Sequence, residues 1–412
     1  MTRSTEAAPI AVLDIGKTNL KLLVASDDGW PLETLSIPNT ANASDPYLSH
    51  DLAGLETWFL DALAKVSQRH AIGAVIATAH GCGAVLVDGD RPVLPMMDYD
   101  AVSPPAIDEA YRRIAPAYRE VFCGIGAGAM RLAKQLLWKE CAFPAEFARA
   151  KTYLTTAQFF ALRLGGRAAS EISQLAAQGH IWDLVRHQPS SVMRERGWAH
   201  LLPQRAPAGA VLGTVSAAVA KRTGLARSTE ILCGVHDSNA NLFRYKAAGM
   251  ADASILSTGT WMIGFQRDLD PNKLDANSAM VLNIDVDGEN VPSTLTMTGR
   301  EYDLIRKEKV LPTPLSLPRC RNSSRGGPWR CPPSSAMMGC SPVPLIAAGS
   351  SVQRPKRPRN GRGWRCSTRH SAQTAALMRS AVRNASLSMA ALPPTCRSRA
   401  HLPPCGHRRM FR

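Results

Sequence analysis

Short apolar runs and longer periodic stretches alternate along the first 310 residues of the chain. Runs rich in branched residues predict strands, and stretches whose apolar residues recur every three or four positions predict helices. The predicted strands are Ile10–Leu13, Leu20–Val24, Ala74–Ala77, Ala84–Val87, Ile231–Cys233, Ser254–Leu256 and Met262–Phe265. The predicted helices are Asp51–Gln68, Gly128–Lys139, Thr156–Leu164 and Ala217–Lys221. The alternation is typical of an α/β fold, and the two successive strands at the start argue against an all-parallel sheet.

The stretch from Leu311 to Arg412 lacks this pattern. Segments such as RPKRPRNGRGWRCSTRH mix Arg, Pro, Gly, Ser and Cys with no apolar period. Nothing there would bury enough apolar surface to offset chain entropy, so we expect residues 311–412 to form a disordered tail. The break is abrupt, near Lys309–Pro314. A frameshift in GC-rich coding DNA is one hypothesis for it, and the DNA around codon 310 would test it.

Charge changes at the same place. The 412 residues include 49 Lys plus Arg and 33 Asp plus Glu, a formal net charge of +16. All 33 acidic residues precede residue 310, whereas 18 of the basic residues follow it, which leaves a net charge of −2 on the first 310 residues. The first part therefore has the charge balance of an ordinary enzyme. A nucleic-acid partner is not favoured and would have to bind through the basic tail.

Cysteine usage and hydropathy bear on location. Six of the ten Cys lie in the tail without a C-x₂-C pair, so we predict no zinc site there. The other four, Cys82, Cys123, Cys141 and Cys233, are scattered, which favours a reducing compartment. The sequence shows neither a signal-peptide pattern nor an apolar run of about 18 residues, so we expect a cytoplasmic protein without a membrane span.

The stretch AVLDIGKTNLKLL contains Gly16-Lys17-Thr18, which is reminiscent of a P-loop. A P-loop needs a further Gly five residues before Gly16, and Ala11 stands there. A P-loop also leads into a helix, whereas a strand is predicted here. Two interpretations fit a strand, turn and strand. It is an ordinary surface hairpin, or it is a phosphate-binding hairpin in which Lys17 and Thr18 donate and Asp14 faces a metal or the phosphates.

Two later stretches carry similar chemistry. In ILCGVHDSNANLF, His236 and Asp237 lie between a predicted strand and a helix start. Asp237 either caps the helix or, exposed in a cleft, accepts a proton from a hydroxyl. In ASILSTGTWMIGF, a Ser-Thr-Gly-Thr turn separates two predicted strands. That turn is either a simple hairpin or a second set of phosphate donors.

Taken together, the three stretches resemble the actin-like ATPase superfamily, and more closely the FGGY carbohydrate kinases. DIGKTNLK is similar to the first phosphate motif of that family, GVHDSNA to the segment with its catalytic Asp, and STGTW to its second phosphate motif. Intervening segments such as LAKQLLWK and YLTTAQFFALRLGGRAASEISQLAAQGHIWDL also resemble the family. The resemblance covers roughly residues 8–306.

The resemblance implies an α/β fold of two ribonuclease-H-like lobes around a cleft. The first lobe would span residues 8–243, the start of an incomplete second lobe residues 244–310, and the tail residues 311–412. The implied reaction moves the γ-phosphate of ATP, bound with Mg²⁺, to a hydroxyl of a ketose such as L-rhamnulose or L-fuculose.

The resemblance also implies roles for single residues. Asp237 would be the general base on the sugar hydroxyl, and Asp14 would hold Mg²⁺ through water. The residues implied to bind ATP are Asp14, Gly16, Lys17, Thr18, Asn19, Ser257, Thr258, Gly259 and Thr260.

A segment spanning residues 77–100 stands where the family places a sugar-binding loop. The substrate candidates are His80, Gly81, Asp98, Asp100 and His236. Asp98 and Asp100 lie in a Pro-flanked loop, so a solvated position is the alternative for both. Glu171 either lines the cleft or, as we favour, lies at a solvated helix end.

The sequence departs from the family after residue 310, where no Gly-rich adenosine segment is recognisable. We therefore expect this chain to fold poorly or to lack kinase activity, while its first lobe keeps the sugar residues. The alternative is a non-catalytic remnant that still binds sugar. The sequence does not determine the oligomeric state, and a homodimer is one possibility.

Overall fold

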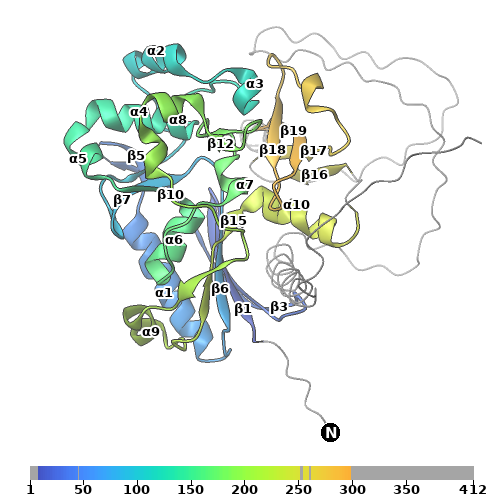
Figure 1. Ribbon diagram of the computed structural model, residues 1–412. Helices are drawn as coiled ribbons and strands as arrows, with labels where there is room; N and C mark the ends of the chain where they lie inside the picture. Colours follow the sequence, from blue (N-terminus) through green and yellow to red (C-terminus); the bar gives the residue numbers. More distant parts are fainter. Residues whose placement is uncertain (1–7, 45, 251–253, 259–260, 298–412) are drawn as a thin grey trace, which may run out of the picture.

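A computed structural model describes residues 8–44, 46–250, 254–258 and 261–297 of the chain (Figure 1). The α/β alternation predicted from the sequence is confirmed in this part, and every predicted strand and helix is present within a few residues of its expected ends. The expected tail, residues 311–412, and its disorder lie outside the described residues. So do Gly259 and Thr260 of the second candidate phosphate turn.

The first lobe is built on a seven-stranded mixed sheet. β1 pairs antiparallel with β2 and parallel with β6, which agrees with the expectation that the sheet is not all parallel. β15 pairs with the far end of β6. In spatial order the strands are β13 (Val211–Thr214), β14 (Glu230–Leu232), β6 (Ala74–Ala79), β1 (Ile10–Ile15), β2 (Asn19–Ala25) and β3 (Pro31–Pro38), with β15 (Val235–His236) beside β6.

Helices cover both faces of this sheet (Figure 1). The helices of the first lobe are α1 (Leu52–Ser67), α2 (Pro105–Ile114), α3 (Tyr118–Val121), α4 (Leu132–Ala142), α5 (Pro144–Arg149), α6 (Thr156–Leu164), α7 (Ile172–Leu175), α8 (Ser191–Glu195) and α9 (Ala217–Thr223), with a 3₁₀ turn at Trp198–Leu201. α10 (Asp237–Ala247) follows β15 and leads toward the second lobe.

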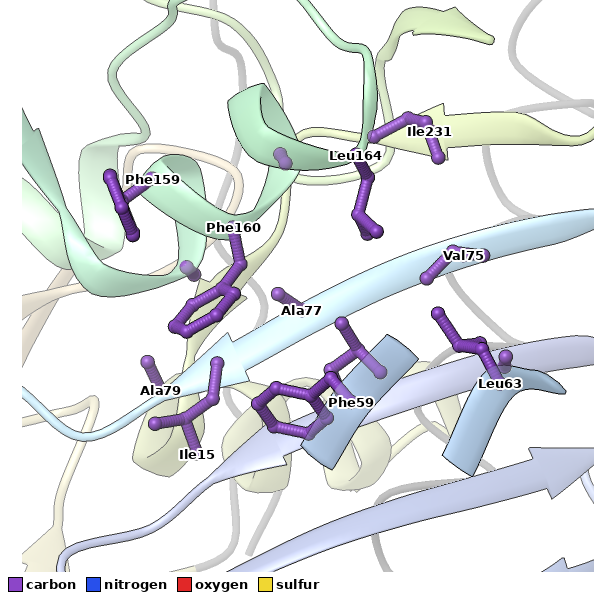
Figure 2. Packing of buried hydrophobic residues seen from close by; sticks show 14 of the residues in the cluster. Ile15, Phe59, Leu63, Val75, Ala77, Ala79, Phe159, Phe160, Leu164 and Ile231 are labelled. Carbon is purple, nitrogen blue, oxygen red and sulfur yellow. The ribbon is translucent and has the colours of Figure 1, made fainter. Parts of the chain in front are cut away.

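The continuous apolar runs of β1 and β6 follow from burial of both strand faces. Alternate residues of β1, such as Leu13, share one core with α1, α6 and α9, and the intervening residues, such as Val12, share another with α10. Phe59 of α1 and Phe160 of α6 meet edge to face beside β6, with ring centroids 5.3 Å apart (Figure 2). The central strands are thereby held between two helical layers.

Three small sheets complete the first lobe. They are β10 (Thr152–Thr155), β7 (Ala84–Asp88) and β8 (Arg91–Pro92); β4 (Asn42–Ser44), β5 (Tyr47–His50) and β9 (Met96–Met97); and β11 (Trp182–Asp183) with β12 (Gln188–Pro189). The sheet of β4, β5 and β9 matters for the site, because it carries the segment that follows Met97.

Within residues 244–310, the expected start of the second lobe, the described part is a four-stranded antiparallel sheet. Its strands, in spatial order, are β16 (Ile255–Thr258), β17 (Met262–Phe265), β19 (Asn290–Thr296) and β18 (Met280–Ile284), with a 3₁₀ turn at Pro271–Lys273. β18 contributes Leu282 and Ile284, and the segment before it contributes Leu274, to a core made mostly of first-lobe residues. No helix in the described part of the chain has the length and apolar character needed to cross a bilayer.

Lys139 of α4 is a buried amine whose solvation is lost on folding. Its side chain is inaccessible to solvent, and Nζ has no hydrogen-bond partner among the described residues. The nearest compensation is the ring of Tyr47, whose centroid lies 5.8 Å from Nζ. Burial lowers the pKa of Lys139 from 10.5 to about 7.

We expect Lys139→Met to raise the free energy of unfolding by about 2 kcal/mol at pH 6, because the substitution removes an unpaired buried charge. Below pH 7 both states of the wild type carry the charge, and above it only the unfolded state does, so wild-type stability rises toward pH 10.5. The advantage of Lys139→Met should therefore shrink between pH 6 and pH 9, as measured by urea unfolding.

Lys134→Met is the matched control, since Lys134 is also buried on α4 but forms an ion pair with Asp108. Its substitution should destabilise the protein at both pH values. A gain for Lys139→Met that is the same at pH 6 and pH 9 would contradict the assigned pKa.

Candidate active site

A cavity of about 330 Å³ lies where the first sheet, α10 and the second sheet meet. This volume is within the usual range for small-molecule sites. Its lining includes the predicted residues Asp14, Gly16, Lys17, Thr18, Asn19, His80, Gly81, His236, Asp237 and Ser257. The cavity therefore brings together residues from all three candidate stretches and from the predicted sugar loop.

Strand pairing explains this convergence. β1 and β15 both run parallel to β6, and in the two registers Asp14 and Val235 are each paired with Thr78. Asp237 follows directly after β15. The two aspartates, more than 200 residues apart in sequence, therefore reach the same edge of the sheet.

The β1–β2 turn is narrow and held by backbone hydrogen bonds. The Gly16 N–H donates to the Asn19 carbonyl at 3.0 Å, and Asn39 Nδ2 donates to the Gly16 carbonyl at 2.7 Å. A Cβ on Gly16 would stand 2.9 Å from the Asn19 oxygen, so only glycine fits without a shift. Thr18 and Asn19 are exposed at the tip and line the cavity.

Lys17 points away from the solvent-facing tip of that turn. Its ammonium group contacts the Asp98 carboxylate and lies 3.1 Å from Oδ2 of Asp100. The Tyr99 ring centroid is 4.6 Å from the same nitrogen. Lys17 lines the cavity, but its charge is engaged by the segment after β9.

Asp98 is buried completely, so the solvated alternative for this residue is wrong. Although burial raises the pKa of Asp98, the adjacent His50 ring and the Lys17 ammonium group hold it below its ordinary value. The Asp100 N–H also donates to Asp98 Oδ1 at 2.8 Å. Asp98 and Asp100 are not among the residues that line the cavity; they stand behind Lys17 and Tyr99.

Asp14 is a carboxyl group in an unfavourable place for a charge. Burial raises its pKa from 3.8 to about 6, Lys21 opposes this shift, and the nearby charge of Asp237 adds to it. Lys21 Nζ lies 3.7 Å from Asp14 Oδ2. A cation bound between the two aspartates would offset the desolvation of the Asp14 carboxylate and the repulsion between the two negative charges.

The Asp237 carboxylate is oriented at the start of α10. Its Oδ1 accepts hydrogen bonds from the Ser238 N–H at 2.5 Å and the Ser238 hydroxyl at 3.1 Å. His236 Nε2 lies 3.3 Å from the same oxygen, and Asn239 Nδ2 lies 3.1 Å from His236 Nδ1. Burial lowers the pKa of His236, so a neutral ring with its proton on Nε2 satisfies both contacts.

His80 offers an acceptor to the cavity. Its Nδ1 is 2.8 Å from the Gly81 carbonyl, which places the proton on Nδ1. Burial and the neighbouring His50 lower the pKa of His80 to about 4, so the ring is neutral and Nε2 is a lone-pair acceptor. That Nε2 is buried without a partner among the described residues.

Other buried polar atoms of the lining also lack partners within the described chain, namely Thr78 Oγ1 and Asn241 Oδ1. Buried polar atoms are rarely left unpaired, so their gathering around one cavity indicates a polar ligand. Sequence reasoning missed both residues, together with Tyr99, Arg131, Gln178 and Trp261 in the same lining. Asn241 could have been found, because it stands four residues after Asp237 on the same helical face.

The second candidate phosphate turn is described only in part. Ser257 lines the cavity, and its hydroxyl accepts a hydrogen bond from Asn241 Nδ2 at 3.0 Å. Thr258 ends β16, and its side chain, like Gly259 and Thr260, lies outside the described residues.

Glu171 differs from its expected position at a solvated helix end. Its side chain is fully buried, and it caps α7 by accepting the Gln174 N–H at 3.0 Å. It also accepts a hydrogen bond from the Ser173 hydroxyl at 2.6 Å. Burial raises the pKa of Glu171 to about 7. The expectation was wrong because α7 packs against β15 and β18, which cover this helix end.

The residues present fit a magnesium ion only in part. Among the described residues, no group of three or more His, Cys, Asp or Glu side chains could enclose a metal. Asp14 and Asp237 supply one or two carboxylates, which is how Mg²⁺ is bound when substrate phosphates and water provide its other ligands. A magnesium ion here would depend on a phosphate-bearing ligand.

Comparisons with known proteins agree with this geometry. A model of the N-terminal domain of the FGGY family of carbohydrate kinases matches residues 10–243, and a model of the FGGY C-terminal domain matches residues 250–320. The second match extends beyond the break expected near residue 310.

Curated relatives and solved structures point the same way. The chain is 26% identical over 269 residues to an L-fuculokinase of Salmonella typhi and 25% identical over 270 residues to that of Escherichia coli K12. A carbohydrate kinase from Novosphingobium aromaticivorans superposes with a TM-score of 0.68 at 30% identity, covering 73% of this chain and 66% of that one. A xylulose kinase from Rhodospirillum rubrum gives 0.62 at 19% identity, covering 73% and 63%.

These structures confirm the predicted α/β fold of actin-like ATPase type. The two L-fuculokinase matches each cover 62% of this chain and 55% of the relative. The chain thus spans about half the length of the curated relatives it matches.

We expect the Asp14 carboxyl to titrate near pH 6 in carboxyl-detected NMR of protein labelled at aspartate. Asp237→Asn should lower this midpoint, because it removes a neighbouring negative charge, and Lys21→Met should raise it. An Asp14 midpoint near 3.8 would refute the assigned environment.

Proposed function

The chain belongs to the FGGY family of carbohydrate kinases, and we propose that it transfers the γ-phosphate of ATP to a hydroxyl group of a ketose. The observation that carries the proposal is the cavity in which Asp14 and Asp237 adjoin unpaired polar atoms. Similarity to L-fuculokinases supports L-fuculose, L-rhamnulose or a related ketose as the acceptor.

In the proposed mechanism Asp237 is the general base. Its carboxylate is about two-fifths exposed toward the cavity, with Oδ1 held by Ser238. It takes the proton from the sugar hydroxyl as that oxygen attacks the γ-phosphorus. The bond from phosphorus to the bridging oxygen breaks, and ADP leaves. Such help is worth on the order of 100- to 10,000-fold in rate.

Asp14 would hold the metal ion, and the two turns would bind the phosphates. A bound magnesium ion would supply positive charge to the phosphate oxygens. We propose the Gly16–Asn19 turn and the Ser257–Thr260 turn as the phosphate ligands, through hydroxyl groups and backbone N–H groups. Neutral His80, with its unpaired Nε2, is proposed to accept a hydrogen bond from a sugar hydroxyl, with Gly81 and His236 beside it.

A tight approach supports the sugar role of the β6–β7 loop. A Cβ added to Gly81 would stand 3.1 Å from His236 Nε2 and 3.0 Å from the Ala177 Cβ. A larger residue at this position would displace His236, which touches Asp237. The four cysteines in the described part of the chain are unpaired, which supports the cytoplasm as the proposed location.

One alternative has an observation in its favour. The unpaired polar atoms of His80 and Thr78 both belong to the first lobe, so a non-catalytic protein that binds sugar through this lobe is the second candidate. Calorimetry separates the two functions. Sugar binding without Mg-ATP binding or ADP release would favour the remnant, and turnover would exclude it.

We expect Asp237→Asn to lower kcat by a factor on the order of 100 to 10,000, with the sugar Kd changed by less than about threefold. ADP release with L-fuculose, L-rhamnulose, D-xylulose and glycerol measures the first quantity, and calorimetry measures the second. Asp61→Asn, an exposed change on α1, should leave both unchanged. A kcat for Asp237→Asn close to wild type would exclude this residue as the base.

A further inference from the structure

Three consecutive residues surround the Lys17 ammonium group. It contacts the carboxylate of Asp98, lies 3.1 Å from Asp100 Oδ2, and stands 4.6 Å from the Tyr99 ring centroid. A lysine has three N–H donors. Two carboxylates and an aromatic face account for these contacts without any phosphate.

Burial makes this cluster stronger than a surface ion pair. The Lys17 side chain is 13% exposed and that of Asp98 is 0% exposed. Charges in such surroundings interact at low dielectric, and removing one partner leaves the other uncompensated. His50 Nε2 lies 2.9 Å from Asp98 Oδ2, which fixes the carboxylate from β5 as well.

The element held by this cluster faces the cavity. Tyr99 lines the cavity, whereas Asp98 and Asp100 on either side of it do not. The Tyr99 ring meets His80 edge on, with centroids 5.7 Å apart and planes at 82°. Trp261 Nε1, from the second lobe, lies 3.4 Å from the Tyr99 hydroxyl. Tyr99 therefore stands between Lys17, the unpaired His80 acceptor and the opposite lobe.

We propose that Lys17 is a positioning residue, which holds Tyr99 as the sugar-facing wall of the cavity, and is not a phosphate ligand. Carbohydrates place C–H faces against aromatic rings and hydroxyls against polar atoms, and Tyr99 beside His80 supplies both. The negative charges of Asp98 and Asp100 neutralise the ammonium group, so the phosphates are left to the turn backbone and hydroxyls. This inference rests on the proposed sugar kinase function.

Ligand binding to the full chain tests the assignment. We expect Lys17→Met and Tyr99→Leu each to raise the Kd for L-fuculose at least tenfold, while the Kd for Mg-ATP changes less than threefold, both measured by calorimetry. If Lys17 bound phosphate, its substitution would instead raise the Kd for Mg-ATP and leave the Kd for L-fuculose nearly unchanged. A tenfold loss of Mg-ATP affinity in Lys17→Met with L-fuculose binding intact would overturn the proposal.

A second measurement needs no ligand. Urea-unfolding midpoints for Lys17→Met, Asp98→Asn, Tyr99→Leu and the two double variants containing Lys17→Met form two double-mutant cycles. Each double variant should be destabilised by clearly less than the sum of its single variants, because the contacts of Lys17 with Asp98 and Tyr99 are lost only once. Asp98→Asn combined with Lys221→Met, an exposed change on α9, should be additive.

The two measurements distinguish failure of the proposed kinase function from failure of the positioning role proposed for Lys17. Wild-type protein that binds neither L-fuculose nor Mg-ATP would count against the proposed function and against a sugar-facing wall. Additive effects in both Lys17 cycles would overturn the proposed positioning role of Lys17, whatever the measured ligand affinities are. Non-additive cycles together with the selective loss of L-fuculose affinity would support it.

Discussion

The parallel pairing of β6 with both β1 and β15 is the constraint on which the site depends. Asp14 is the last residue but one of β1, Asp237 follows directly after β15, and Thr78 of β6 pairs with both Asp14 and Val235. The two helical layers that bury both faces of these strands keep that edge rigid. Asp14 is thereby buried near the partly exposed Asp237, and its burial together with that neighbouring charge raises the pKa of Asp14.

Low dielectric has opposite effects around the same cavity. It makes the unpaired polar atoms of His80, Thr78 and Asn241 unfavourable unless a ligand forms hydrogen bonds with them. It also strengthens the contact of Lys17 with Asp98, because neither group can turn to water. One part of the cavity is thus ready for a ligand, and another is already satisfied internally. This contrast separates the binding atoms from those that hold the wall.

The start of the second lobe is anchored through the core of the first. Leu282 and Ile284 of β18 pack with first-lobe residues, and Asn283 accepts a hydrogen bond from Gln178 Nε2 at 2.6 Å. These contacts lie within the described residues and place β16 and β17 across the cavity from the β1–β2 turn. Apolar packing therefore helps to bring Ser257 of β16 to the cavity that Thr18 and Asn19 also line, independently of any phosphate contact.

The strands and helices around the site, the narrow turn at Gly16 and the three stretches that converge on the cavity can all be predicted from the amino-acid sequence. These features depend on periodicity and turn chemistry, which act over a few residues. The contact of Lys17 with Asp98, the burial of Glu171, and the positions of Thr78 and Trp261 in the cavity lining become visible only in the folded chain. Lys17 and Asp98 are 81 positions apart, and nothing local to either residue names its partner. Pairing and burial of distant groups follow from which strands become neighbours, because charge and polar interactions are set by distance and solvent exclusion rather than by sequence order.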